Sequence, residues 1–91
     1  MLVTLEEAKL YLRIDSDDED SLVESLIESA ETLCRDVARL SAEDFTAEKA
    51  TTRVAVLYAI AYLYEHREEA DYHELILMLR SLLFGVRRQV F

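Results

Sequence analysis

The fold of this chain is decided by residues 53–67, which are Arg53-Val54-Ala55-Val56-Leu57-Tyr58-Ala59-Ile60-Ala61-Tyr62-Leu63-Tyr64-Glu65-His66-Arg67. Eleven successive apolar residues, 54–64, leave this segment without a polar face, and a helix that is apolar all round is buried on most sides. The run is too short to cross a bilayer, which takes about 20 residues. We therefore expect a soluble protein in which this helix is central and buried, with a polar boundary near its end.

The composition indicates one small all-α domain. The chain has 91 residues, no proline and one glycine, and it shows no strand-like alternation, so helices joined by short links are expected. A chain of this length buries only about 60 to 65% of its unfolded surface on folding, so the isolated subunit is expected to be marginally stable. We expect residues 1–91 to form a single domain, with 86–91 as a flexible tail.

Apolar spacing predicts about four helices that pack as a small bundle around the central one. Thr4 and Glu7 have the spacing of a capping box, so a short helix of about two turns starts there. A long amphipathic helix follows over about 18–40, and the central helix spans about 46–67. After a tight connection, a last amphipathic helix ends near Gly85, the natural stop signal.

The negative charge is concentrated in the first half of the chain. Residues 1–48 hold 14 acidic and 4 basic side chains, whereas residues 49–91 hold 5 and 6, and the net charge is −9. This negative charge repels phosphate, so specific duplex binding through a basic face is disfavoured. Passive contact with nucleic acid is compatible with the charge. Glu24, Glu28 and Glu31 lie on the polar face of the second helix, which is either simply solvated or a partner surface.

The acidic run at 15–20 precedes the second helix and has two interpretations. Carboxylates at alternate positions resemble a calcium-binding loop, but the sixth position of a loop from Asp17 is Leu22 and not glycine. We expect the run instead to stabilise the N-terminus of the helix, where acidic side chains complement the helix dipole.

Motifs for catalysis, cofactors or metal ions are missing from the sequence. The Glu-x-x-His spacing of di-iron bundles does not occur, and a single glycine cannot build a phosphate loop. Cys34 falls on the apolar stripe of the second helix, as a structural thiol does. His66 and His73 are expected to be solvated, a surface metal site being the alternative. We expect no catalytic residue, no cofactor and no metal ion.

Basic and apolar residues mark the C-terminal tail. Arg87, Arg88 and Phe91 are too few for a nucleic-acid site, which needs a basic patch with interleaved aromatics. The tail is either a disordered end or a segment that docks on the acidic half of an adjacent copy.

Three segments resemble, in order and spacing, the bacteriophage head-tail connector proteins, also described as adaptor or DNA-packaging proteins. The first is Leu5-Glu6-Glu7-Ala8-Lys9-Leu10-Tyr11-Leu12-Arg13-Ile14-Asp15, followed by the acidic run and residues 22–30. The second is residues 59–68, a small-residue helix that ends in Tyr64-Glu65-His66-Arg67, and the third is residues 79–83 followed by Arg87. The chain departs from the family pattern in its short, proline-free link before the last helix, which leaves the orientation of the terminal segment open.

The resemblance implies a non-enzymatic structural protein of the phage neck. Such subunits assemble under the portal protein into a ring of about twelve copies, which extends the channel for duplex DNA without sequence-specific binding and docks the next neck or tail component. The implied location is the virion neck, and the bacterial host cytoplasm during assembly, with no membrane partner. The alternative function is a small acidic regulatory or adaptor bundle that binds a single protein partner.

Two groups of residues are the candidate sites under this interpretation. The candidate subunit interface consists of Tyr64, Glu65, Arg67, Arg87, Arg88 and Phe91. The candidate acidic lumen, or partner face, consists of Glu24, Glu28 and Glu31.

Overall fold

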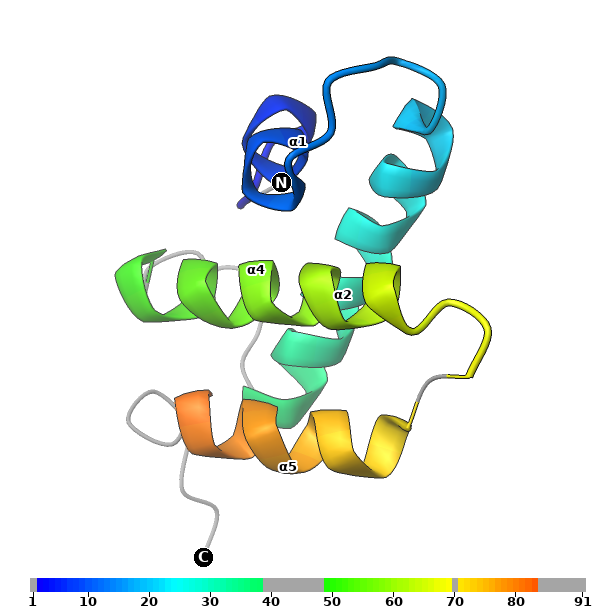
Figure 1. The fold of residues 1–91 in the computed structure, drawn as a ribbon. Helices are drawn as coiled ribbons and strands as arrows, with labels where there is room; N and C mark the ends of the chain where they lie inside the picture. Colours follow the sequence, from blue (N-terminus) through cyan, green and yellow to red (C-terminus); the bar gives the residue numbers. More distant parts are fainter. Residues whose placement is uncertain (1, 39–48, 70, 84–91) are drawn as a thin grey trace, which may run out of the picture.

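Four α-helices form the fold in the computed structural model, which describes residues 2–38, 49–69 and 71–83. They are α1 (Leu5–Leu12), α2 (Asp20–Ala38), α4 (Lys49–Glu65) and α5 (Tyr72–Leu83). Figure 1 shows α4 across the middle of the molecule, with α1 on one side of it, α5 on the other and α2 running across it. The prediction of a small all-α bundle around a central helix is confirmed.

Helix α1 starts at the predicted capping box. The Thr4 hydroxyl accepts a hydrogen bond from the Glu7 amide at 3.1 Å, and the Glu7 carboxylate accepts one from the Thr4 amide at 3.1 Å. The helix ends after two turns at Arg13, whose φ of 61° is left-handed, and the Ile14 amide closes the end by donating to the Lys9 carbonyl at 2.9 Å. Left-handed backbone is uncommon for a residue other than glycine, but the end of the helix after two turns agrees with the predicted short helix.

Helix α2 buries the apolar stripe that its spacing predicts. Its fully buried residues are Val23, Ile27, Ala30, Cys34 and Ala38. The helix begins at Asp20, two residues after the predicted start, and the predicted end at Leu40 lies outside the described residues. This stripe packs against α1, α4 and α5, so α2 holds the other three helices together.

Helix α4 is the predicted central helix, and it is covered on most sides. Its buried residues are Thr52, Ala55, Val56, Ala59, Ile60, Tyr62 and Leu63. Val54, whose side chain is 57% exposed, lies on the part of the helix that the other described helices leave uncovered. The helix ends at Glu65, two residues before the predicted end, and the predicted start at Thr46 lies outside the described residues.

Helix α5 packs one face onto α4 and α2. Leu75, Leu79 and Leu83 are fully buried, and the start is capped by the Asp71 carboxylate, which accepts a hydrogen bond from the Glu74 amide at 3.1 Å. The link between α4 and α5 is a connection, as expected, and not a bent continuation. Within the described ranges, no helix is both long and apolar enough to cross a membrane.

Candidate assembly surfaces

The polar end of α4 is tied to the rest of the subunit by Tyr64. Its hydroxyl donates a hydrogen bond to Oε1 of Glu19 at 2.7 Å, which joins the last turn of α4 to the start of α2. The accepting carboxylate, together with burial, raises the pKa of Tyr64 above its ordinary value. The Tyr64 side chain therefore links two helices within the subunit and also forms part of its surface.

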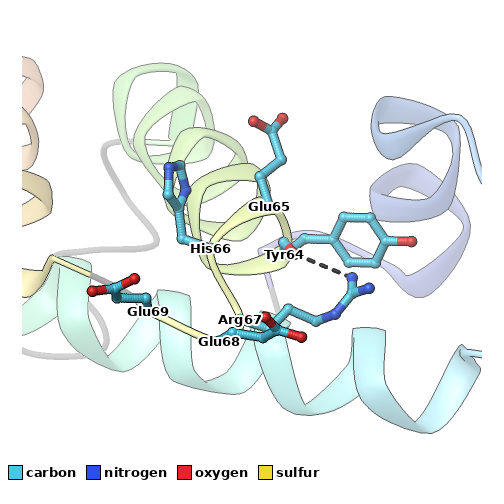
Figure 2. A pocket seen from close by; sticks show the side chains of 6 residues that line it. All are labelled: Tyr64, Glu65, His66, Arg67, Glu68 and Glu69. Carbon is cyan, nitrogen blue, oxygen red and sulfur yellow. Dashed lines mark hydrogen bonds between the residues drawn. The ribbon is translucent and has the colours of Figure 1, made fainter.

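Arg67 folds back over Tyr64. Its Nη1 donates to the Tyr64 carbonyl at 3.1 Å, and its guanidinium carbon lies 4.6 Å from the centre of the Tyr64 ring (Figure 2). This geometry satisfies a carbonyl at the end of α4 and adds a cation–π contact. Arg67 thus caps the helix that it follows.

An open hollow of about 550 Å³ surrounds this end of α4. It is lined by Tyr64, Glu65, His66, Arg67, Glu68 and Glu69. Figure 2 shows Glu65 and His66 pointing away from the Tyr64–Arg67 pair. The His66 ring stacks on Tyr62 with a centroid distance of 4.1 Å, and its Nδ1 lies 2.9 Å from the Tyr62 carbonyl oxygen. Glu65, Glu68 and Glu69 remain exposed, so the hollow presents an acidic rim.

The structure brings together one part of the predicted interface. Tyr64, Glu65 and Arg67 line the same hollow. Arg87, Arg88 and Phe91 lie outside the described residues.

The three glutamates of the predicted acidic face differ in their surroundings. Glu24 and Glu28 are exposed, whereas Glu31 is partly buried. Both carboxylate oxygens of Glu31 lie 3.2 Å from the Leu2 amide nitrogen and accept its hydrogen bond. Glu31 therefore anchors the segment before α1, and Glu24 and Glu28 are the freer part of this face.

A second hollow, of about 460 Å³, lies where α2 meets the ends of α4 and α5. Glu28, Ser29, Thr32, Leu33, Asp36, Leu63 and Tyr72 line it. It combines two carboxylates with apolar walls, so it adds an acidic, partly apolar surface next to the predicted face.

The acidic run before α2 is held by a lysine of α1. Nζ of Lys9 lies 2.9 Å from Oδ1 of Asp17 and 2.7 Å from the buried Oδ1 of Asp20. These carboxylates raise the pKa of Lys9, and the ammonium in turn lowers the pKa of Asp17. Among the described residues, no group of three or more His, Cys, Asp or Glu side chains is placed to hold a metal ion. The acidic run thus joins α1 to α2. This role could not be predicted from the sequence, because it depends on where the fold places Lys9.

Cys34 is buried among apolar neighbours, as its place on the stripe predicts. Burial, with a smaller contribution from the charge of Glu31, raises the pKa of its thiol to about 12. A thiol in this state is protonated at neutral pH, as expected of a buried structural cysteine.

A family model for phage gp6-like head-tail connector proteins matches residues 2–88. The chain belongs to this family. No significant match was found among curated proteins or among solved structures. The family places the connector among the structural proteins of the phage neck and gives no indication of catalysis. The likeness noted in the sequence is therefore confirmed over almost the whole chain.

The connector exposes several large apolar side chains that sequence reasoning did not single out. They are Leu10 (81% exposed), Tyr11 (51%), Val54 (57%), Tyr72 (56%), Leu77 (50%) and Met78 (41%). Helical spacing was the sequence signal that could have identified two of them, because it places Leu10 and Leu77 away from the buried faces of their own helices. Such residues on a small subunit are candidates for burial in an assembly.

Proposed function

We propose that this connector forms a ring of about twelve subunits under the portal protein, extends the DNA channel and docks the next neck or tail component. The observation that carries this proposal is the family match over residues 2–88. The exposed apolar side chains on α1, α4 and α5 support it, since assembly removes such surface from water. Assembly takes place in the host cytoplasm before the connector enters the virion neck.

The acidic face of α2 lines the channel in this proposal. Glu24 and Glu28 are exposed, and the half of the chain that contains them carries most of the negative charge. Like charge keeps a moving duplex from adhering to the wall, so contact with DNA is passive and independent of sequence. Glu31 contributes less, because its carboxylate is engaged by the Leu2 amide. A ring structure with Glu24 and Glu28 on the outer surface would disprove this assignment.

The polar end of α4 contributes to contacts between neighbouring proteins. Tyr64 and Arg67 form a pre-ordered surface beside exposed Glu65, so this surface loses little side-chain freedom on binding. The tail residues Arg87, Arg88 and Phe91 supply positive charge and an aromatic ring for the acidic half of an adjacent copy.

Electron microscopy of the concentrated protein, with and without purified portal protein, tests the ring. Annular particles are expected in at least one condition, with the portal as a template where the connector alone stays monomeric. Portal denatured by heat is the control for non-specific clustering. Monomers or dimers under both conditions would contradict the ring and would favour a small acidic adaptor that binds one protein partner.

A further inference from the structure

Two apolar patches lie on the outside of two different helices. The α1 patch consists of Leu10 and Tyr11, and the α5 patch consists of Leu77 and Met78. All four side chains are at least 41% exposed, and Leu10 reaches 81%. Both patches present large apolar side chains directly to solvent.

The leading residue of each patch points away from the core. Leu10 comes two residues after buried Ala8, and Leu77 comes two residues after buried Leu75. Two residues correspond to about 200° around an α-helix, so each leucine lies opposite its buried neighbour. Neither can be covered by the helices that cover Ala8 and Leu75.

The two patches also lie on opposite sides of the subunit. Figure 1 shows α1 on one side of α4 and α5 on the other. Among the described helices, α1 contacts α2 and α4 but not α5. One subunit cannot bring its own two patches together, whereas two subunits can.

Charges of opposite sign flank the two patches. Glu6 is four residues before Leu10, and Arg80 is three residues after Leu77, so each charge lies beside its leucine on the helix surface. Both side chains are exposed, and neither has an ion-pair partner within the part of the chain that the structure describes. Exposed Arg13, three residues after Leu10, and exposed Glu74, three residues before Leu77, add the opposite sign to each patch, so an antiparallel contact between the two helices can place Glu6 opposite Arg80 and Arg13 opposite Glu74.

We propose that the α1 patch of one connector subunit packs on the α5 patch of the next, with Glu6 facing Arg80 across the contact. This inference rests on the proposed ring and names its subunit interface. A contact between two different patches leaves one of each free on every growing assembly, so it repeats until the ring closes. A second copy is the occupant because the same chain supplies both apolar centres and both complementary charges.

Cysteine cross-linking tests the pairing under ring-forming conditions. A Leu10→Cys variant and a Leu77→Cys variant are mixed and treated with a short bis-maleimide. We expect a cross-linked dimer only in the mixture, and a ladder of multimers from the chain that carries both substitutions. The wild-type chain is the control for Cys34, which is buried, and a mixture of Glu24→Cys with Leu77→Cys is the control for an exposed cysteine outside the patches.

The outcomes separate this inference from the proposed function. Rings that form without the Leu10–Leu77 cross-link would overturn the inference and leave the ring intact. A Leu10→Cys variant that cross-links mainly to itself would also overturn it, because the contact would then be symmetric. The absence of rings with and without the portal would overturn both.

Charge reversal gives a second, independent test. Glu6→Arg and Arg80→Glu should each weaken the contact roughly two- to fivefold, as the loss of an exposed ion pair does. Both reversals in one chain should restore the ring yield, since every contact then keeps a pair of opposite charges with the two signs exchanged. Ring yield is measured by electron microscopy, and circular dichroism checks that each variant is folded. A double variant that assembles no better than the single ones would overturn the pairing.

Discussion

The Tyr62 hydroxyl bonds twice to the backbone of Asp71, donating to its carbonyl oxygen at 3.2 Å and accepting from its amide nitrogen at 3.1 Å. Tyr62 is only 9% exposed and belongs to the core, while Asp71 caps the start of α5. A single side chain thus contacts both backbone polar groups of the residue from which α5 begins, and the Asp71 carbonyl also accepts the Leu75 amide at 3.0 Å. The contact fixes where α5 starts relative to α4.

Tyr62→Phe should lower the free energy of unfolding by about 1 to 2 kcal/mol. The ring stays and the Asp71 carbonyl keeps the hydrogen bond from the Leu75 amide, but the partly buried Asp71 amide loses its partner, and an unsatisfied buried group costs about that much. Urea unfolding followed by circular dichroism measures the change. Tyr58→Phe is the matched control, because Tyr58 is a partly buried residue of the same helix and its hydroxyl has no hydrogen bond to any described residue. Equal effects of the two substitutions would contradict the assigned role.

The hydrogen bond from Tyr64 to Glu19 predicts a loss of stability at alkaline pH. The pKa of Tyr64 is raised in the folded state, chiefly because the Glu19 carboxylate accepts a hydrogen bond from its protonated hydroxyl. The contribution is therefore complete below the unfolded pKa of about 10 and is lost as pH rises through the folded pKa. Melting temperature measured across this range should fall less steeply for Tyr64→Phe than for the wild type. Tyr72→Phe, at an exposed position, should follow the wild type, and identical slopes for all three would contradict the prediction.

Local sequence signals predicted the helices well. The spacing of apolar residues located the stripe of α2, and the capping box at Thr4 and Glu7 set the start of α1, because both depend on residues three or four positions apart. The burial of α4 followed from its continuous apolar run. The exposure of Val54 was not predicted, because a continuous apolar run shows which residues are apolar but not how far the neighbouring helices extend over them.

The contacts of the candidate surfaces could not be predicted in the same way. Glu31 and Leu2 are 29 residues apart, and Glu19 and Tyr64 are 45 residues apart. Such pairs depend on how whole helices are packed, which no local pattern specifies. The family resemblance did locate the polar end of α4, because residues 64–67 are contiguous in sequence.

Glu31 and Glu28 should respond differently to truncation, although they lie one turn apart on α2. Glu31→Ala removes the carboxylate that accepts the Leu2 amide, and a hydrogen bond to a charged group contributes about 1.5 to 3 kcal/mol, less where it is partly exposed. We expect a loss of about 1 kcal/mol. Glu28→Ala, at an exposed site, should stay within about 0.5 kcal/mol of the wild type in the same urea titration. Similar values would mean that the Leu2 contact adds nothing to stability.

Cys34 should resist thiol reagents until the protein unfolds. With a pKa of about 12, its thiolate fraction near pH 8 is lower than that of a free cysteine on the order of a thousandfold, and burial slows access further. Labelling followed by mass spectrometry should be slow in buffer and fast in urea above the unfolding midpoint. A Leu10→Cys variant provides the comparison, with one rapidly labelled site. Rapid labelling of the wild type in buffer would contradict a buried structural thiol.

Arg67→Ala distinguishes the capping role of this residue from a role in assembly. The substitution removes one hydrogen bond to the Tyr64 carbonyl and one exposed cation–π contact, so the free energy of unfolding should fall by no more than about 1 kcal/mol. Helix content measured by circular dichroism should stay nearly unchanged. If Arg67 also contacts a neighbouring subunit, the ring yield should fall more than this small loss explains.

Arg67→Lys is the informative control, because it keeps the charge but loses the planar guanidinium that lies over the Tyr64 ring. A contact that needs only positive charge should survive in the lysine variant, whereas one that needs the stacked geometry should be lost in both. Ring yields are compared by electron microscopy well below the melting temperature of each variant. An unchanged yield for Arg67→Ala would remove Arg67 from the interface, and a parallel loss of helix content and rings would make it a structural cap alone.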